Sequence, residues 1–225
     1  MIDFTKSLKG VDLSQEDLAG RDFSGMDFSD ANLAGLDLSD SDFTNVNFTN
    51  AILKDADCRG AEMRTCKFTG ANLTGINMSN MCLRWENMNG LDMTGANLSG
   101  SDMTGCLLDG TNLSSANLTN TSLVESGMRG CNLTGADLTN ADITAANLTG
   151  SDLSNANLTG AVYTSDDEVD EDEWETSFND TTLTNTNFGG AVVYKANFKG
   201  SNLQEANLEN IMFSSCIGAQ LPFVG

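Results

Sequence analysis

The chain has 225 residues, with 32 acidic side chains, 11 basic side chains, a formal net charge of −21 and no histidine. The absence of histidine excludes Ser-His-Asp and Cys-His catalysis and removes the commonest protein metal ligand. The strong acidity argues against direct binding of nucleic acid or of anionic membranes, because both would repel the chain.

The amino-terminal residues MIDFTKSLKG lack the apolar core of a signal peptide. No apolar run approaches the roughly 20 residues of a membrane span, and the six cysteines follow no disulfide-framework spacing. The sequence therefore predicts a cytoplasmic protein that is not an enzyme and that needs no cofactor or metal.

A repeat of five residues begins near the start of the chain. From Leu8, every fifth residue is apolar as far as Tyr163, and the series resumes in the same frame at Phe178 and runs to Phe213. These 40 positions hold 21 Leu, 9 Phe, 6 Met and one each of Cys, Ile, Val and Tyr. A smaller residue, often Ala, stands two positions earlier, and Asp or Asn usually lies between the two. The last position of the unit holds 18 of the 22 glycines, which indicates a turn.

A period of five fits neither a helix nor an ordinary strand. It fits a short straight segment that ends in a turn, so that four segments form a square coil of about 20 residues, stacked at about 4.8 Å. Phe28, Phe48 and Phe68 are spaced by 20 residues. We therefore expect their rings to form a column inside the coils.

The units Ala96–Gly100 (ANLSG) and Ala136–Asn140 (ADLTN) resemble the A(D/N)LXX motif of the pentapeptide repeat family, and the resemblance covers residues 6–163 and 176–215. It implies an all-β fold, a right-handed quadrilateral β-helix of about ten coils. The expected parts are a first β-helix segment at 1–163, an acidic loop at 164–177, and a β-helix continuation with a carboxy-terminal cap at 178–225.

The cysteines mostly fall inside this frame. Cys66, Cys106, Cys131 and Cys216 occupy the small inward position, and Cys58 occupies the large one. We expect buried and unreactive thiols at these five positions. Cys82 stands where Asp or Asn is usual, with no ligand cluster around it.

The acidic loop interrupts the repeat with ten extra residues. Eight of the ten residues from Asp166 to Glu175 are acidic, and glutamates fill the inward positions 168 and 173, where an unpaired charge cannot be buried. A partner-binding loop and a solvated tether are both open interpretations. The candidate contact residues in the loop are Asp166, Asp167, Glu168, Asp170, Glu171, Asp172, Glu173, Trp174 and Glu175.

Acidic residues also recur every 20 positions near the amino end. Asp17, Asp37 and Asp57 form one expected row, and Asp22, Asp42 and Glu62 form a second row on the adjacent face. Averaged over a rod of about 48 Å, the net charge is one per about 2.3 Å, compared with one per about 1.7 Å in duplex DNA. Such rows could occupy a basic DNA-binding channel.

Residues 51–100 are neutral by contrast, because Lys54, Arg59, Arg64, Lys67 and Arg84 offset five acidic residues. A solvated surface and a contact patch are both possible there. Trp85 lies outside the inward series in this stretch, and it is a candidate partner-binding anchor.

The resemblance also suggests a function. Some pentapeptide repeat proteins, including plasmid quinolone-resistance proteins and a mycobacterial relative, mimic DNA and bind DNA gyrase or topoisomerase IV. The first hypothesis is therefore an acidic DNA mimic that inhibits or protects a bacterial DNA-handling enzyme, with gyrase or topoisomerase IV as first candidate. The alternatives are a phage-type inhibitor of RNA polymerase or of a defence nuclease, or an adaptor rod without DNA mimicry. The sequence leaves monomer and dimer open.

Overall fold

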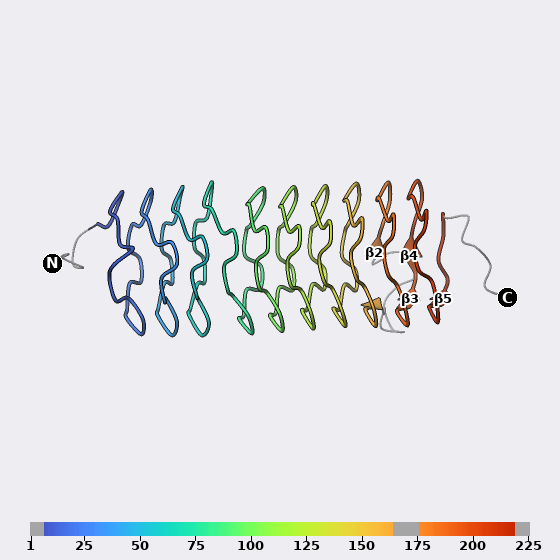
Figure 1. Cartoon of the computed structure of the whole chain (residues 1–225), viewed down its shortest axis with the longest axis horizontal. Coiled ribbons are helices and arrows are strands. Elements are labelled where there is room, and N and C mark those ends of the chain that lie inside the picture. The colour runs from blue at the N-terminus through green and yellow to red at the C-terminus, as the bar shows by residue number, and fades with distance from the viewer. Residues whose placement is uncertain (1–6, 164–175, 219–225) are drawn as a thin grey trace.

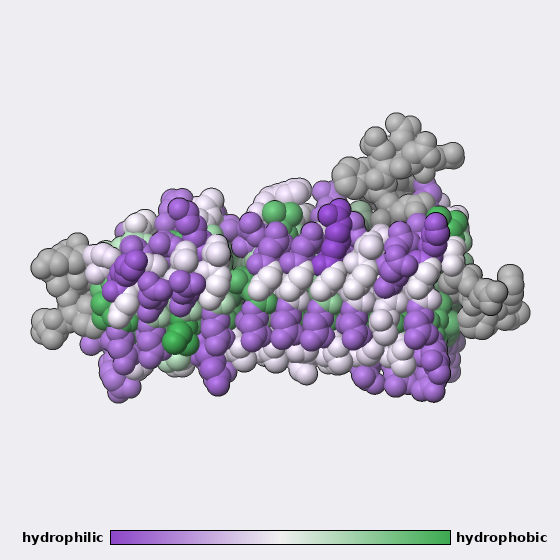
Figure 2. Space-filling model, turned by 90° about the horizontal axis from the view of Figure 1, so that it is seen from above, coloured by the Kyte–Doolittle hydropathy of each residue, from purple (hydrophilic) through white to green (hydrophobic). Residues whose placement is uncertain are grey.

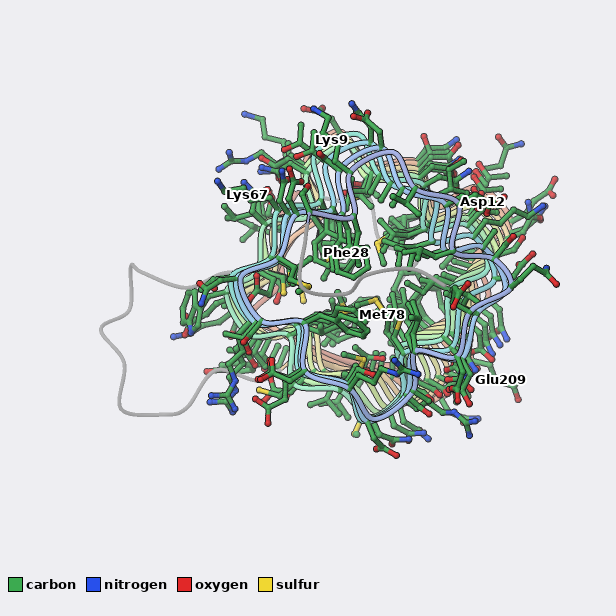
Figure 3. All side chains as sticks on the ribbon, turned by 90° about the vertical axis from the view of Figure 1, so that its left-hand side faces the viewer. Lys9, Asp12, Phe28, Lys67, Met78 and Glu209 are labelled. Atoms are coloured by element: carbon green, nitrogen blue, oxygen red, sulfur yellow. The ribbon has the colours of Figure 1, made fainter. Side chains whose placement is uncertain are left out.

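The computed structural model of the chain describes residues 7–163 and 176–218. These residues wind into a straight rod of stacked coils (Figure 1). Viewed along its axis, the rod has a four-sided outline, with Phe28 and Met78 inside and Lys9, Asp12, Lys67 and Glu209 pointing outward (Figure 3). The outline follows from the sequence, because each five-residue unit forms one side.

Parallel bridges between residues 20 positions apart hold neighbouring coils together. Asp12 pairs with Asn32, Asn32 pairs with Ile52, and the column continues to Asp152, where the spacing becomes 30 residues. The column consists of Asp12, Asn32, Ile52, Asn72, Asp92, Asn112, Asn132, Asp152, Thr182 and Asn202. The 20-residue coil predicted from the repeat is therefore the unit of the fold. The ten extra residues are accommodated without a change of face.

Within residues 7–163 and 176–218, five segments are long enough to be strands. They are β1 (Val162–Tyr163), β2 (Thr176–Ser177), β3 (Val192–Tyr194), β4 (Ala196–Asn197) and β5 (Met212–Ser214). One parallel sheet has the order β1-β3-β5 and a second has the order β2-β4. β2 begins at Thr176, inside the segment assigned above to the acidic loop, and the remaining loop residues 164–175 lie outside the described residues.

Nearly every described corner is a turn with a left-handed residue, and the corner at Gln15 is an exception. In the turn after Phe28, the Ala31 N–H donates to the Phe28 carbonyl at 3.1 Å, and Asp30 has a φ of 60°. A positive φ at the third residue is what a type II turn requires, and Gly, Asn and Asp tolerate it best. This explains why the fifth position of the unit is mostly Gly, Asn or Asp.

The interior is filled by the large series, with the small series leaving room beside it. Phe48 and Phe68 stack with ring centroids 5.5 Å apart and planes at 8°. Phe28 lies next in the same column, 5.6 Å from Phe48. The predicted ring column is therefore confirmed. The buried state predicted for Cys58, Cys66, Cys106 and Cys131 is also confirmed, whereas Cys216 is only partly buried.

One inward polar atom is left without a partner. The Tyr163 hydroxyl is fully buried, and no described residue accepts or donates a hydrogen bond to it. An unsatisfied buried hydroxyl destabilises the folded state by about 1 to 3 kcal/mol. Tyr163→Phe should therefore raise the melting temperature, measured by circular dichroism. Tyr194→Phe, at a partly exposed site, is the control and should change little. A lower melting temperature for Tyr163→Phe would contradict this prediction.

Candidate functional site

The coil stacking brings the predicted acidic rows together on the rod surface. Asp22 bridges to Asp42 and Asp42 bridges to Glu62, so this row is continuous. In the other row, Asp37 bridges to Asp57. Asp17 is exposed one coil earlier, and no bridge joins it to Asp37 in the described chain.

The aspartates of the rows also stabilise their own turns. Asp22 accepts the Ser24 N–H at 2.9 Å, and Asp37 accepts the Ser39 N–H at 3.0 Å and the Ser39 hydroxyl at 2.6 Å. The Ser24 N–H lowers the pKa of Asp22, and the Ser39 hydroxyl and N–H lower the pKa of Asp37. Both groups are therefore ionised at neutral pH. One oxygen of each carboxylate is committed to the fold.

Arg59 neutralises one end of the Asp17–Asp57 row. Its Nη2 lies 2.6 Å from Asp57 Oδ2, and its Nε donates to both carboxylate oxygens. This pairing with Arg59 lowers the pKa of Asp57. The pair is exposed and adds little stability, but it removes net charge from the row at this coil.

Among the described residues, the net charge is densest in the amino-terminal coils. Residues 7–50 hold nine acidic and two basic side chains, a net of −7, whereas residues 51–100 hold five of each. Residues 7–50 make about 2.2 coils, so their charge density is one per about 1.5 Å of rod, close to the value of about 1.7 Å for duplex DNA. Another eight acidic residues lie between 164 and 175. The net charge is therefore unevenly distributed along the rod, unlike the average of −21 over its whole length.

Trp85 is on the surface, as the repeat frame predicted. Its side chain is 65% exposed, and its φ is 63°, at a corner where Gly, Asn or Asp usually stands. The ring lies over Gly105, where a Cβ would overlap it. A bulky residue in the left-handed region is strained. The fold therefore holds this large apolar side chain at the surface at some energetic cost.

Several predicted contact residues cannot be placed. Asp166, Asp167, Glu168, Asp170, Glu171, Asp172, Glu173, Trp174 and Glu175 lie outside the described residues. Their role stays a prediction from the sequence.

Glu86 is a buried charged residue that was not among the predicted site residues. Among the described residues it is the one buried charged side chain, 9% exposed, and it stands in a small inward position. Burial raises its pKa, and the Thr65 N–H that it accepts acts in the opposite direction. The signal was present in the repeat frame, as a glutamate where Ala, Ser, Thr or Cys is usual.

In residues 7–163 and 176–218, no group of three or more His, Cys, Asp or Glu side chains could hold a metal ion. The same residues include no helix with the length and apolarity needed to cross a membrane.

Sequence comparison identifies the repeat. A family model described as pentapeptide repeats matches eight copies, at residues 7–45, 41–80, 92–130, 128–160 and 176–214. No curated protein sequence matches the chain.

Structure comparison gives the fold. One similar structure is HetL, a pentapeptide repeat protein involved in heterocyst differentiation regulation from the cyanobacterium Nostoc sp. strain PCC 7120. HetL is 24% identical to this chain, with a TM-score of 0.65, and the match covers 96% of this chain and 90% of HetL. QnrB1, a plasmid-mediated fluoroquinolone resistance protein, is 17% identical with a TM-score of 0.28, over 95% of this chain and 88% of QnrB1. The likeness to HetL establishes the right-handed four-sided β-helix.

The double role of the row aspartates gives a prediction. Asn accepts the same turn hydrogen bond elsewhere, as Asn97 does from the Ser99 N–H at 3.2 Å. Asp37→Asn should therefore leave the melting temperature unchanged, whereas Asp37→Ala should lower it by about 2 to 4 °C. Thermal unfolding followed by circular dichroism compares the two variants. Equal losses in both would contradict the assigned hydrogen bond.

The lowered pKa values also predict acid sensitivity. The folded-state pKa values of Asp22, Asp27 and Asp37 lie below 3.8, so their stabilising contribution is present above that pH and is lost as the pH falls through the lowered values. Urea unfolding at about pH 5 and about pH 3 should give a smaller free energy of unfolding at the lower pH. In the triple Asp→Asn variant the difference between the two pH values should shrink, and an unchanged difference would contradict the assignment.

Proposed function

The chain belongs to the pentapeptide repeat family, and we propose that it is a non-enzymatic DNA mimic that inhibits or protects a bacterial DNA-handling enzyme. DNA gyrase and topoisomerase IV are the first candidates, as the resemblance to the DNA-mimicking members implies. The observation that carries the proposal is the DNA-like charge density of residues 7–50, presented on a rigid coil surface.

The geometry supports competition with DNA. Asp22, Asp42 and Glu62 lie on successive coils, so their carboxylates are repeated at the strand spacing of about 4.8 Å. The face of the rod shown in Figure 2 is mostly hydrophilic to neutral, with scattered hydrophobic residues. A basic groove that neutralises phosphates would neutralise these carboxylates in the same way.

The mechanism is mutually exclusive binding. The acidic coils enter the DNA-binding groove, Lys and Arg side chains of the enzyme pair with the carboxylates, and the duplex is displaced. Because both ligands release counterions from the same groove, affinity for the protein should fall steeply with salt, as DNA affinity does.

A displacement assay tests the proposal. Fluorescently labelled duplex DNA is bound to purified gyrase, and fluorescence anisotropy follows its release as the protein is added. The test variant is Asp17→Asn/Asp22→Asn/Asp37→Asn/Asp42→Asn/Glu62→Gln, which keeps every turn acceptor but removes five charges. We expect a loss of displacement of at least about tenfold at low salt.

The matched control changes Asp92, Asp102, Asp137, Asp142 and Asp152 to Asn, which removes the same number of charges at distant coils and keeps each turn acceptor. It should displace DNA as well as the wild type does. Equal displacement by the wild type and by the five-site test variant would contradict the proposal, as would a failure of the wild type to displace DNA from gyrase, topoisomerase IV, RNA polymerase or a nuclease at low salt.

One observation favours the adaptor alternative. Trp85 is strained and 65% exposed, and the surrounding residues 51–100 carry no net charge. An exposed tryptophan is a frequent interface anchor. If Trp85→Ala abolished binding to a partner while the five-site test variant did not, the adaptor function would replace DNA mimicry.

A further inference from the structure

Between the coil of residues 62–70 and the coil of residues 82–89, the backbone ladder is interrupted on two of the four faces. No bridge joins Glu62 to Cys82 or Lys67 to Asn87 in the described chain, although each of these residues is bridged to the coil on its other side. The other two faces stay paired across the same level, through Ile52, Asn72 and Asp92 and through Asp57, Asn77 and Asn97. Figure 1 shows the wider gap between the turquoise and green coils. We call the opening between residues 62–70 and 82–89 the coil cleft.

Oversized inward residues explain the opening. Four consecutive small positions hold Ile76, Met81, Glu86 and Leu91, whereas the flanking positions hold Ala71 and Ala96. The two unpaired faces are those that follow Met81 and Glu86. A single larger residue at a small position is accommodated, since Val46 is buried on a face that stays paired on both sides. The run of four adds more atoms than a closely packed interior can take at the normal coil spacing.

Glu86 also occupies the place of a backbone partner. In a regular coil the N–H at this corner donates to the carbonyl 19 residues later, as Asn45 does to Arg64 at 2.9 Å. Thr65 would by that rule donate to Arg84, but it donates to Glu86 Oε1 at 2.9 Å instead. The glutamate side chain therefore stands between the two coils and keeps them apart.

The cleft edges present unpaired main-chain groups. The N–H groups of Met63, Phe68, Gly70, Cys82 and Asn87 have no backbone acceptor within the described residues. One coil earlier, by contrast, the Phe48 N–H donates to the Lys67 carbonyl at 2.8 Å. Unpaired strand edges are templates for another strand.

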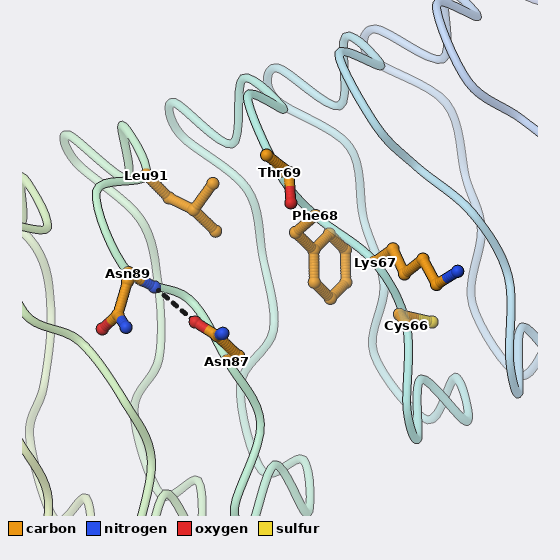
Figure 4. A pocket seen from close by; sticks show the side chains of 7 residues that line it. All are labelled: Cys66, Lys67, Phe68, Thr69, Asn87, Asn89 and Leu91. Atoms are coloured by element: carbon orange, nitrogen blue, oxygen red, sulfur yellow. Dashed lines mark hydrogen bonds between the residues drawn. The ribbon is translucent and has the colours of Figure 1, made fainter.

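A cavity of about 330 Å³ lies in the cleft. Its lining residues are Cys66, Lys67, Phe68, Thr69, Asn87, Asn89 and Leu91. In Figure 4 Asn87, Asn89 and Leu91 come from one coil and face the segment 66–69 of the other, while the Lys67 side chain extends away from the two asparagines. The volume falls within the range of known ligand sites. The lining combines amides with apolar groups.

Two cations lie beside the opening. Arg64 and Lys67 are exposed, and neither forms an ion pair within the described part of the chain. An anionic group on the outer surface beside residues 62–70 would lie near both. The ligand that matches these features has main-chain donors and acceptors together with a carboxylate.

We propose that the coil cleft binds an extended acidic peptide segment of a partner protein, whose main chain pairs with the open strand edges and whose carboxylate lies near Arg64 and Lys67. The binding mode is strand addition, in which the main chain supplies affinity and side-chain contacts supply specificity. Glu86 and Met81 keep the site open. The inference is independent of the DNA-mimic proposal, because the two surfaces share no residue except Glu62, at the end of its row.

Hydrogen exchange tests the open state. In the wild type the amides of Phe68 and Asn87 should exchange at least about 100-fold faster than those of Phe48 and Met88, which are paired in the ladder. Met81→Ala/Glu86→Ser restores residue types found in the same columns, at Ala61 and Ser126. It should slow the exchange of Phe68 and Asn87. Ile76→Ala, on a paired face, should not. Slow exchange of these amides in the wild type would overturn the proposal.

Peptide binding tests the occupant. A pooled set of hexapeptides in which Val or Thr alternates with Asp or Glu is added to the full chain, and protection of the Phe68 and Asn87 amides is measured. We expect protection in the wild type, loss of protection with backbone N-methylated peptides, and at least about tenfold weaker binding to Arg64→Gln/Lys67→Gln. Absence of protection by every member, or equal protection by N-methylated peptides, would overturn the proposal.

Discussion

The structure depends on one packing constraint: each five-residue side contributes one large and one small side chain to an interior of fixed width. The hydrophobic gain from burying the large residue holds each coil closed. The small residue lets the next coil approach to hydrogen-bonding distance. Both the regular rod and the coil cleft follow from how this constraint is met or violated.

The same constraint leaves the outward positions free to carry charge. The position before each large residue often supplies an oxygen that accepts a backbone N–H, and Asp37 and Asn97 both do so. Charge can therefore change along the rod without a change of fold. The amino-terminal coils use Asp at this position and become strongly acidic, whereas later coils use Asn more often.

Much of the fold could be predicted from the sequence, because the period of five is almost unbroken. The ring column of Phe48 and Phe68 and the corners at glycines followed directly. The coil cleft was not predicted from the period of five, because Met81 and Glu86 both keep that period. They depart from the usual small residue only in side-chain size and, for Glu86, in charge. The left-handed φ of Trp85 was also missed, because a tryptophan gives no turn signal. The acidic residues between 166 and 175 lie outside the described structure, so their part in the function rests on the sequence alone.

The central functional claim is that the acidic amino-terminal coils replace DNA in a basic groove. The most direct measurement is capture of partners from a bacterial lysate with the full chain, at low and at high salt, with and without competing duplex DNA, followed by mass spectrometry. The account predicts recovery of a DNA-handling enzyme that high salt releases and that duplex DNA displaces. Recovery of only salt-resistant partners that DNA does not displace would contradict it.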